Sequence, residues 1–433
     1  MEIRRTRSVC PVCLKNIPAV LDQEKDGRIY MSKSCPEHGP FRALVWQGAS
    51  DFARWSLGSE PLTGQQGLSC PGNCGLCTEH ESGSCCVLLE VTDRCNLHCR
   101  YCFADPENAA ADPPADHIKE QIRDIAARCG RPLLQFSGGE PTMRDDLPEL
   151  VREAKSAGCS YVQVNTNGIR LAQDPAYVQA LAEAGLDIVF LQFDGTRDDI
   201  YRQLRGRPLL EEKTRAIEVC GHAGIGVTLV PTVVPGVNDQ NLGELVRFAA
   251  QHVPDVRGIH FQPVSYFGRI PEDGIPQERY TLDRLMKDVA EQAGFSMEIF
   301  QPSRCDHPLC GFHAQFLVGA GGRLKPLTNF SHSSPERGTA RDNREYVGRH
   351  WRRPGEETPP AGYTQGSGEN TQDDDMDFDT FLYCLRHRSL TLSAMAFQDA
   401  MNLNIERLHR CTLHVYDHGR VRPFCAQYLT PLG

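Results

Sequence analysis

The sequence predicts an α/β fold built on a parallel sheet that closes partly or wholly into a barrel. Six short apolar segments with strand character recur from residue 87 onward, and helical stretches lie between them. Repeated β/α units of this kind place their strands in parallel and carry functional residues at the strands' C-terminal ends. The expected strands are 87–92, 133–136, 161–164, 188–192, 226–230 and 259–262. The expected helices include 115–128, 145–156, 176–184 and 241–252.

Size and composition exclude several broad classes of protein. A chain of 433 residues is long enough for two or three domains. The formal net charge of −10 argues against broad electrostatic binding of nucleic acid. No apolar run approaches the ~18 residues of a membrane span, and no apolar signal region precedes the first cysteine. Nineteen cysteines without a secretion signal are typical of metal ligands rather than disulfides, so we expect a reducing cytoplasm.

Residues 1–58 are expected to form a small module held together by one metal ion. Two short cysteine motifs flank a predicted strand at 29–31. So short a segment cannot build a core of its own, and a bound metal would supply the missing folding energy. The expected ligands, which suit zinc or a rubredoxin-like iron, are Cys10, Cys13, Cys35 and His38. We favour a structural role over nucleic-acid binding, because the segment lacks a dense basic and aromatic face.

A second group of cysteines lies in residues 59–86. Glycine and proline between them permit the tight turns that wrap a chain around a metal cluster. Cys70, Cys74 and Cys77 need one more ligand, either Cys85 or Cys86. Four thiolates would make a closed, auxiliary [4Fe–4S] centre. A second zinc site is the alternative.

The first strand of the predicted barrel leads into three cysteines in a C-x3-C-x2-C pattern: Cys95, Cys99 and Cys102. Iron–sulfur clusters normally take one thiolate per iron. Three thiolates therefore leave the fourth iron of a cubane open to a substrate. Because the loop leaves the C-terminal end of a strand, we expect it on the catalytic face of the barrel. A zinc knuckle one ligand short, or chance in a cysteine-rich protein, are the alternatives.

Polar turns end the next three predicted strands. The glycines of 138–141, Gly-Gly-Glu-Pro, let the backbone approach a ligand closely, and Glu140 can accept a hydrogen bond from a ligand amine. The segments 165–168 and 192–195 carry short polar side chains that suit ribose hydroxyls or a carboxylate. Ordinary turn or capping roles are the alternative, above all for Asn167.

Together these motifs resemble the radical S-adenosylmethionine (SAM) superfamily, whose partial (β/α)6 TIM-like barrel would correspond to residues 87–290. The resemblance implies a [4Fe–4S] cluster on Cys95, Cys99 and Cys102, which reductively cleaves SAM to a 5′-deoxyadenosyl radical. That radical abstracts hydrogen from an unactivated carbon. The residues that the resemblance places at the cofactor are Tyr101, Gly138, Gly139, Glu140 and Pro141, and, near the ribose or carboxylate, Thr166, Asn167, Gln192 and Asp194.

The resemblance extends to a narrower group that contains tetraether lipid synthase and a dihydropterin methylase. It is carried by Cys-Pro-Glu-His-Gly at 35–39 and by the cysteine segment directly before the barrel. Its spacing favours Cys85 over Cys86 as the fourth ligand. It implies an oxygen-sensitive enzyme that performs methylation or C–C bond formation on a pterin-like small molecule or a lipid. Electrons would come from a reductant such as ferredoxin or flavodoxin.

Residues 291–433 are expected to form a C-terminal extension with a second auxiliary [4Fe–4S] cluster. Its expected ligands, which the narrower group supports, are Cys305, Cys310, Cys411 and Cys425. Charge, glycine and proline predict a mobile loop at 337–377. An amphipathic, core-facing helix is predicted at 395–408. The thiols expected only to pack in the core are Cys129, Cys159, Cys220 and Cys384.

A peptide-modifying radical SAM maturase is the alternative function. Such enzymes also carry auxiliary clusters in a C-terminal extension, but Gly419 precedes Cys425 by a longer gap than their pattern prefers. A non-catalytic metal scaffold is disfavoured by the open three-cysteine loop beside the Gly-Gly-Glu-Pro turn. A cobalamin-dependent methylase is disfavoured because no separate nucleotide-binding domain precedes the barrel.

Overall fold

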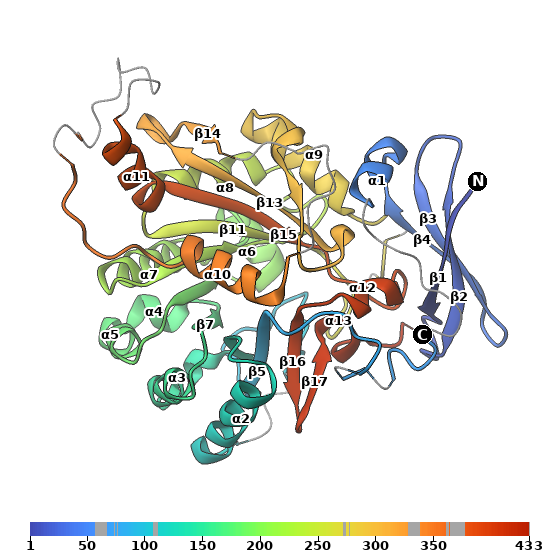
Figure 1. Cartoon of the computed structure of the whole chain (residues 1–433), viewed down its shortest axis with the longest axis horizontal. Coiled ribbons are helices and arrows are strands. Elements are labelled where there is room, and N and C mark those ends of the chain that lie inside the picture. Colours follow the sequence, from blue (N-terminus) through green and yellow to red (C-terminus); the bar gives the residue numbers. More distant parts are fainter. Residues whose placement is uncertain are drawn as a thin grey trace.

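Six neighbouring parallel strands form the centre of the larger of two sheets in the computed structural model (Figure 1). The structure describes residues 1–56, 67–72, 74–75, 77–106, 111–271, 274–276, 278–327, 338–360, 363 and 377–432. The six strands are β5 (Cys86–Thr92), β6 (Leu133–Gly138), β7 (Tyr161–Thr166), β8 (Ile188–Gln192), β9 (Gly226–Val230) and β11 (Val256–Pro263). All six predicted strands are therefore confirmed, with small shifts at their ends.

Strands from the C-terminal third extend this sheet at both edges. One parallel partner, β15 (Ser389–Met395), pairs with β11, and another, β16 (Leu413–Asp417), pairs with β5, so segments far apart in sequence lie side by side in Figure 1. The remaining strands are β10 (Thr232–Val233), β12 (Gln301–Pro302), β13 (Gly311–Val318), β14 (Leu324–Pro326) and β17 (Arg420–Pro423). Within the described residues no ladder joins β17 to β12, so the barrel is open, which agrees with the partial barrel that the resemblance implied and decides between the partly and wholly closed sheets that the pattern allowed.

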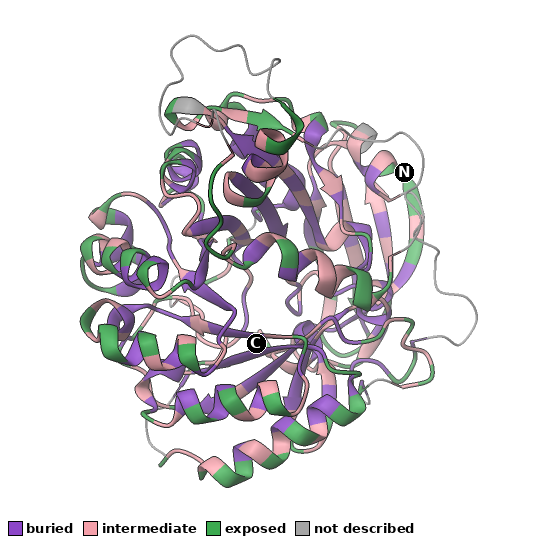
Figure 2. Cartoon of the chain, turned by 60° about the vertical axis from the view of Figure 1, so that its left-hand side comes forward, coloured by how far each residue is buried: buried purple, intermediate pink, exposed green. Residues whose placement is uncertain are grey.

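Helices cover the outer face of the parallel strands, each burying one side and exposing the other (Figure 2). In α2, Ile118, Ile122 and Ile125 are buried at helical spacing, which explains why this segment forms an amphipathic helix. The helices are α2 (Ala115–Arg128), α3 (Leu147–Ser156), α4 (Ile169–Gln173), α5 (Pro175–Glu183), α6 (Asp198–Arg205), α7 (Leu210–His222), α8 (Leu242–Gln251) and α9 (Leu282–Ala293). No helix in the described part of the chain is long and apolar enough to span a bilayer.

The N-terminal module is a four-stranded antiparallel sheet followed by a short helix. Its elements are β1 (Glu2–Val9), β2 (Asn16–Gln23), β3 (Ile29–Cys35), β4 (Gly39–Trp46) and α1 (Ala49–Trp55). One face of this sheet contributes Leu21, Met31 and Trp46 to the main hydrophobic core. The module therefore packs one apolar face against the main hydrophobic core and does not depend on a large core of its own, in line with its short length.

Part of the predicted mobile loop is a helix. Residues 340–351 form α10 (Ala340–Trp351), which begins with a capping box between Thr339 and Asp342. Val347 and Trp351 pack against apolar residues of the parallel strands, which outweighs the polar composition of the segment. The prediction of a mobile loop is thus wrong for 340–351. Of the rest of 337–377, residues 337, 361, 362 and 364–376 lie outside the described residues.

The predicted helix at 395–408 is also wrong. Residues up to Met395 belong to β15, and helix returns only at α12 (Ile405–His409). Between them the buried carboxylate of Asp399 accepts hydrogen bonds from the amides of Tyr266 and Met401, which holds the segment in turns. The remaining helices are α11 (Phe378–His387) and α13 (Phe424–Gln427). Cys384 is buried in α11, as predicted.

Candidate active site and metal centres

A cavity of about 510 Å³ runs through the interior of the open barrel. Its volume lies within the range of ligand-binding sites. The three-cysteine loop and the ends of the parallel strands line one end, and Trp351 of α10 lines it toward the other. The walls combine apolar and aromatic side chains, which supply the larger share of the surface, with uncharged polar ones that include Gln135, Gln163, Asn165, Gln192 and His260. The cavity therefore offers hydrogen bonds at several points within a largely apolar wall.

The three-cysteine loop is fixed by backbone contacts to two neighbouring segments. The amide of Arg100 donates to Leu204 O at 3.0 Å, and the amide of Arg269 donates to Cys102 O at 2.8 Å. The Arg269 guanidinium donates to Cys99 O at 3.1 Å. Cys95, Cys99 and Cys102 are all partly exposed and line the same cavity.

The thiols of this loop suit a cationic partner. Burial, together with the charges of Glu140 and the other two cysteines, raises the pKa of Cys95 to about 12. Burial and the charge of Cys99 likewise raise the pKa of Cys102. Thiols in such a setting ionise only when a metal centre compensates their charge. The donor set therefore fits an iron–sulfur cluster.

The two glycines of the Gly-Gly-Glu-Pro turn allow β6 to contact the chain that leads into this loop. Gly138 has a φ of 121°, and a Cβ there would lie 2.3 Å from Thr92 O. A Cβ on Gly139 would lie 2.3 Å from Arg94 O. The amides of Gly139 and Glu140 donate to those same two carbonyls, both at 2.8 Å. We predicted close approach to a ligand, which stays a prediction; what the structure shows is that the glycines permit close approach to the chain leading into the cysteine loop.

The buried carboxylate of Glu140 ties two strand ends together. Its Oε1 accepts from the amide of Thr142 at 3.0 Å and from the hydroxyls of Thr142 and Thr166 at 2.6 and 2.7 Å. Its Oε2 accepts from the amide of Asn167 at 2.7 Å. Asn167 in turn donates to Asn96 Oδ1 in the cysteine loop at 2.6 Å. The ends of β6 and β7 and the loop thus form one connected network.

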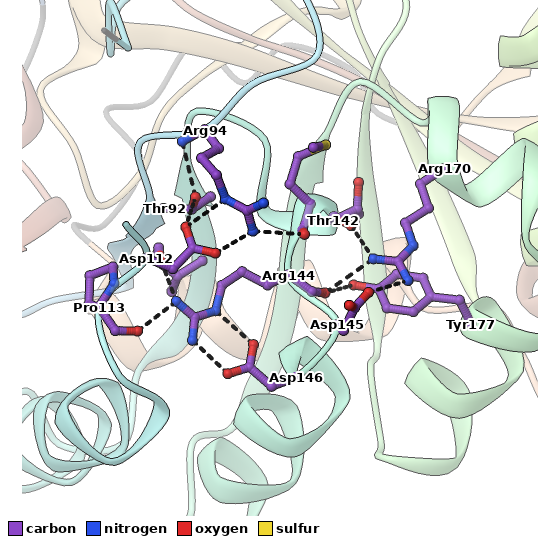
Figure 3. Close-up of polar contacts among 12 residues, drawn as sticks. Thr92, Arg94, Asp112, Pro113, Thr142, Arg144, Asp145, Asp146, Arg170 and Tyr177 are labelled. Atoms are coloured by element: carbon purple, nitrogen blue, oxygen red, sulfur yellow. Dashed lines mark hydrogen bonds and ion pairs between the residues drawn. The ribbon is translucent and has the colours of Figure 1, made fainter. Parts of the chain in front are cut away.

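Three arginines donate hydrogen bonds to backbone carbonyls next to this network (Figure 3). Arg144 is buried, donates to Val91 O at 3.0 Å and forms a bidentate ion pair with Asp146 at 2.8 and 2.6 Å. Arg170 donates to Thr142 O at 2.8 Å, and Arg94 donates to Met143 O at 3.0 Å. These charged hydrogen bonds hold the turn and the start of the loop rigidly, because charge-assisted bonds are stronger than neutral ones.

The structure places the predicted SAM-binding residues in two groups. Seven line the cavity: Tyr101, Gly138, Gly139, Glu140, Thr166, Asn167 and Gln192. Pro141 and Asp194 do not line it. Pro141 is buried at the start of a 3-10 turn, and the buried Asp194 forms a bidentate ion pair with Arg205, both contacts at 2.7 Å.

Two buried basic residues at the site were missed by the sequence analysis. Arg205 lines the cavity, and its guanidinium interacts electrostatically with Asp194 and with Cys99. Lys213 of α7 is buried and donates to Gln192 Oε1 at 2.7 Å. Burial lowers its pKa to about 7. Neither lies in a recognisable motif; each sits on a helix that follows a predicted strand, and only the fold turns it inward.

The N-terminal module brings its four predicted ligands together. The ligand atoms of Cys10, Cys13, Cys35 and His38 all lie within 4.8 Å of one another. His38 Nδ1 lies 3.6 Å from the sulfur of Cys10 and 3.5 Å from that of Cys35. Three thiolates and one imidazole are a usual tetrahedral donor set for structural zinc. The arrangement therefore fits one mononuclear metal ion.

The other predicted ligands are spread over two places: Cys85 and Cys305 line the barrel cavity, whereas Cys70 lies beside the N-terminal module, where Asn16 Nδ2 donates to Cys70 O at 2.6 Å. The sulfurs of Cys70 and Cys74 are 3.5 Å apart, and Cys70 Sγ lies 3.6 Å from His409 Nε2. Glu79, Cys70 and His409 form a compact group of metal-ligating side chains that the sequence analysis missed, because His409 is remote in the chain. All nineteen cysteines are free. His80 Nε2 donates to Cys411 O at 2.9 Å, which fits a supporting role.

Comparisons with known proteins agree with this architecture. The model of the radical SAM superfamily matches residues 89–249, and that of the HMPTM N-terminal zinc ribbon domain matches residues 2–47. A 7,8-dihydro-6-hydroxymethylpterin dimethyltransferase of Methanocaldococcus jannaschii is 34% identical over 470 residues, covering 98% of this chain and 92% of the relative. An Fe-coproporphyrin III synthase of Methanosarcina barkeri is 31% identical over 235 residues, covering 51% of this chain and 56% of that protein.

Among solved structures, the peptide-bound SuiB of Streptococcus suis superposes with a TM-score of 0.42 at 14% identity, covering 67% of this chain and 71% of that chain. The match to the dimethyltransferase has a much higher sequence identity, 34%, and covers nearly the whole of both chains. It spans the ribbon, the barrel and the C-terminal strands together. The chain therefore belongs to the radical SAM superfamily of enzymes and, within it, to the family of the 7,8-dihydro-6-hydroxymethylpterin dimethyltransferase.

Proposed function

We propose that this radical SAM enzyme methylates a pterin-like small molecule at an unactivated C–H bond. The observation that carries the proposal is the set of hydrogen-bonding side chains, Gln135, Gln163, Asn165 and Gln192, in the wall of the barrel cavity beside the three-cysteine loop. The substrate named in the dimethyltransferase's description, a dihydropterin, supports the same class of molecule.

Two buried polar atoms in the wall of the cavity lack partners among the described residues. Gln163 donates from Nε2 to Gln135 Oε1 at 2.7 Å, while its own Oε1 accepts no hydrogen bond. Trp351 Nε1 donates to no described group. An unsatisfied buried polar group costs about 1–3 kcal/mol. Both atoms are buried, so a pterin ring, rich in donors and acceptors, reaches them only after a side-chain rotation turns them toward the cavity, whereas an acyl chain would leave them unpaired in any case.

Aromatic side chains in the same cavity suit a flat ring. Phe190 and Trp351 stack with ring centroids 5.5 Å apart, and His260 packs against both at 5.3 and 5.7 Å. His260 also shares a hydrogen bond of 2.9 Å with Ser393. Flat heteroaromatic ligands bind by stacking on aromatic faces while edge groups set their orientation. This combination supports a pterin over a lipid or a peptide side chain.

The chain's own residues bind and orient in this reaction. We infer that Cys95, Cys99 and Cys102 hold the cluster, which when loaded supplies the electron for reductive cleavage of SAM. Gly138, Gly139 and Glu140 are proposed to receive the methionine amino group. The residues proposed to contact the rest of SAM are Tyr101, Thr166, Asn167 and Gln192. Asp194 acts through Arg205, with which it forms a buried ion pair.

Further components follow from the free thiols and from the family. We infer two auxiliary [4Fe–4S] clusters on the remaining cysteine groups, one mononuclear zinc or iron in the ribbon, and a low-potential donor such as ferredoxin or flavodoxin. The absence of disulfides among all nineteen cysteines supports a reducing cytoplasm.

The test is anaerobic turnover of the reconstituted full chain with SAM, dithionite and 7,8-dihydro-6-hydroxymethylpterin. We expect 5′-deoxyadenosine and a methylated pterin by mass spectrometry. Gln163→Leu should keep SAM cleavage while lowering pterin methylation about tenfold, because one hydrogen-bonding group to the ring is lost. An absence of methylated pterin, with products formed from ether lipids or peptides instead, would reject the pterin substrate.

A further inference from the structure

His260 is one of the side chains of β11 that face the cavity. Side chains alternate between the two faces of a strand. In β11, Ile259 and Phe261 are fully buried in the main core, whereas His260 and Gln262 line the cavity. His260 is half-buried, in contrast to its two neighbours. Its open surface therefore faces the interior of the barrel.

The ring of His260 is held in place by three other elements. Its centroid lies 5.3 Å from that of Phe190 in β8 and 5.7 Å from that of Trp351 in α10. Its Nδ1 shares a hydrogen bond of 2.9 Å with the hydroxyl of Ser393 in β15. These contacts fix the ring, so the second ring nitrogen, Nε2, keeps one position in the cavity wall.

The hydrogen bonds of Ser393 indicate which nitrogen of His260 carries the proton. The Ser393 hydroxyl donates to Ile259 O at 3.4 Å, and a hydroxyl has only one proton to donate. The arrangement that uses both contacts has the Ser393 oxygen accepting from a protonated Nδ1 of His260. Burial lowers the pKa of His260 to about 4, so the ring is neutral near pH 7 and Nε2 is a hydrogen-bond acceptor.

This acceptor is open to a ligand. His260 Nε2 makes no hydrogen bond within the described part of the chain, and unlike Gln163 Oε1 it is not fully buried. Gln262, two residues further along β11, lies about 7 Å nearer to the strand end at which the cysteine loop sits. His260 is therefore deeper in the barrel than the strand-end groups proposed to bind SAM, on the side left for the substrate.

We propose that His260 Nε2 accepts a hydrogen bond from a ring N–H of the substrate and thereby selects a heteroaromatic ring in one orientation. This inference rests on the proposed pterin substrate and names a residue that recognises it. A dihydropterin carries ring N–H groups, whereas an acyl chain has none. The stacked rings of Phe190 and Trp351 beside His260 offer aromatic surface to the same ligand. A polar group built to pair with a ligand discriminates strongly, because a ligand without the matching group leaves it unpaired.

The test is binding of 7,8-dihydro-6-hydroxymethylpterin to the reconstituted full chain. Equilibrium dialysis under anaerobic conditions, with SAM but without reductant, gives Kd values for the pterin and for SAM. His260→Phe keeps an aromatic ring but removes both nitrogens, so the Kd for the pterin should rise about tenfold or more, with the Kd for SAM unchanged. His260→Gln retains an acceptor oxygen and should lose less affinity. Ser393→Ala frees the proton on Nδ1 to move to Nε2, and the Kd should rise about threefold.

His252→Phe is the matched control. His252 is also half-buried, also forms a hydrogen bond through Nδ1, at 2.7 Å to Phe248 O, and stacks on Phe248 at 4.0 Å, but it does not line the cavity. This variant should bind the pterin and SAM like the wild type.

The outcomes separate this inference from the proposed function. Wild-type pterin affinity in His260→Phe, or equal losses in His260→Phe and His260→Gln, would overturn the role of Nε2 while the pterin remains the substrate. A parallel loss of SAM affinity in His260→Phe would also overturn it, because the ring would then support the barrel rather than the substrate. A wild-type chain that does not bind the pterin would reject the proposed substrate and this inference together.

Discussion

The site at the strand ends and the cysteine-rich region beside it are assembled in different ways. At the strand ends, the cysteine loop, the Gly-Gly-Glu-Pro turn and the segment 165–168 follow three consecutive strands, which pair with each other in chain order. In the cysteine-rich region, Cys85, Cys305 and Cys411 come from the start of β5, a loop before β13 and a loop before β16. The first site is positioned by topology, whereas the second depends on individual side-chain contacts such as those of Asp306.

The largest effect is expected at the strand-end site. Replacing Cys99 by Ala removes one of three cluster ligands, so we expect 5′-deoxyadenosine formation from SAM to fall at least about a thousandfold, as for loss of an essential catalytic group. The measurement is chromatographic quantification of 5′-deoxyadenosine after reduction.

Cys159→Ala is the matched control. Cys159, unlike the partly exposed Cys99, is buried in the main core and does not line the cavity. This variant should cleave SAM at the wild-type rate, with only a modest loss of stability. Equal activity of the two variants would remove the three-cysteine loop from the active site.

This difference between the regions also explains how much could be predicted. Apolar runs and their spacing identified all six central strands and, through them, the face on which the cysteine loop lies. The donor set of the ribbon was predictable because Cys10, Cys13, Cys35 and His38 lie in two short motifs joined by a hairpin.

What could not be predicted depends on long-range packing. The polar composition of 340–351 hid the few apolar side chains, Val347 and Trp351, that anchor α10 beneath the barrel. His409 lies beside Cys70 only because β16 pairs with β5. The sequence around Lys213 does not predict its role, because its contact with Gln192 depends on how α7 packs against the barrel.

The second prediction tests how rigid the backbone of the strand-end site is. Gly138→Ala places a Cβ 2.3 Å from Thr92 O at a positive φ, so either the turn or the strand must move. We expect a loss of about 3–4 kcal/mol in the free energy of unfolding, from backbone strain plus the clash. Gly224→Ala is the control: its φ of 76° is also positive but lies in the left-handed helical region, nothing lies within 4 Å of an added Cβ, and the change should cost only about 1 kcal/mol. Chemical denaturation compares the two, and equal losses would show that the close contact is unimportant.

The third prediction tests the cysteine-rich region, whose segments are joined by individual side-chain contacts. Asp306→Ala removes the acceptor for the amide and hydroxyl of Thr412, so we expect a loss of about 2 kcal/mol and weaker retention of iron during gel filtration. Asp306→Asn keeps an acceptor oxygen and should lie closer to the wild type. SAM cleavage should survive in both variants, because Asp306 makes no contact with the three-cysteine loop in the described hydrogen bonds. Selective loss of cleavage in Asp306→Ala would show that the two regions are not independent.

The smallest effect concerns the charge of Lys213. Burial lowers its pKa to about 7, against about 10.4 for an unfolded lysine. Above pH 7 the folded state therefore binds fewer protons at this residue than the unfolded state, and stability rises with pH until the unfolded lysine also titrates. Below pH 7 both states are protonated and the full cost of burying the charge remains. Between pH 7 and 8 the gain is about 1 kcal/mol.

Hydrogen exchange of the α7 amides, corrected for the intrinsic pH dependence of exchange, measures this gain locally. Lys213→Met leaves Gln192 Oε1 without its donor at every pH, which shifts its stability by a constant amount but removes the slope. The informative quantity is therefore the difference in slope between wild type and variant, not the difference in stability. Parallel curves would mean that Lys213 keeps an ordinary pKa. Its position at the strand-end site would then reflect compensation by nearby anions such as Asp194, rather than burial of an uncompensated charge.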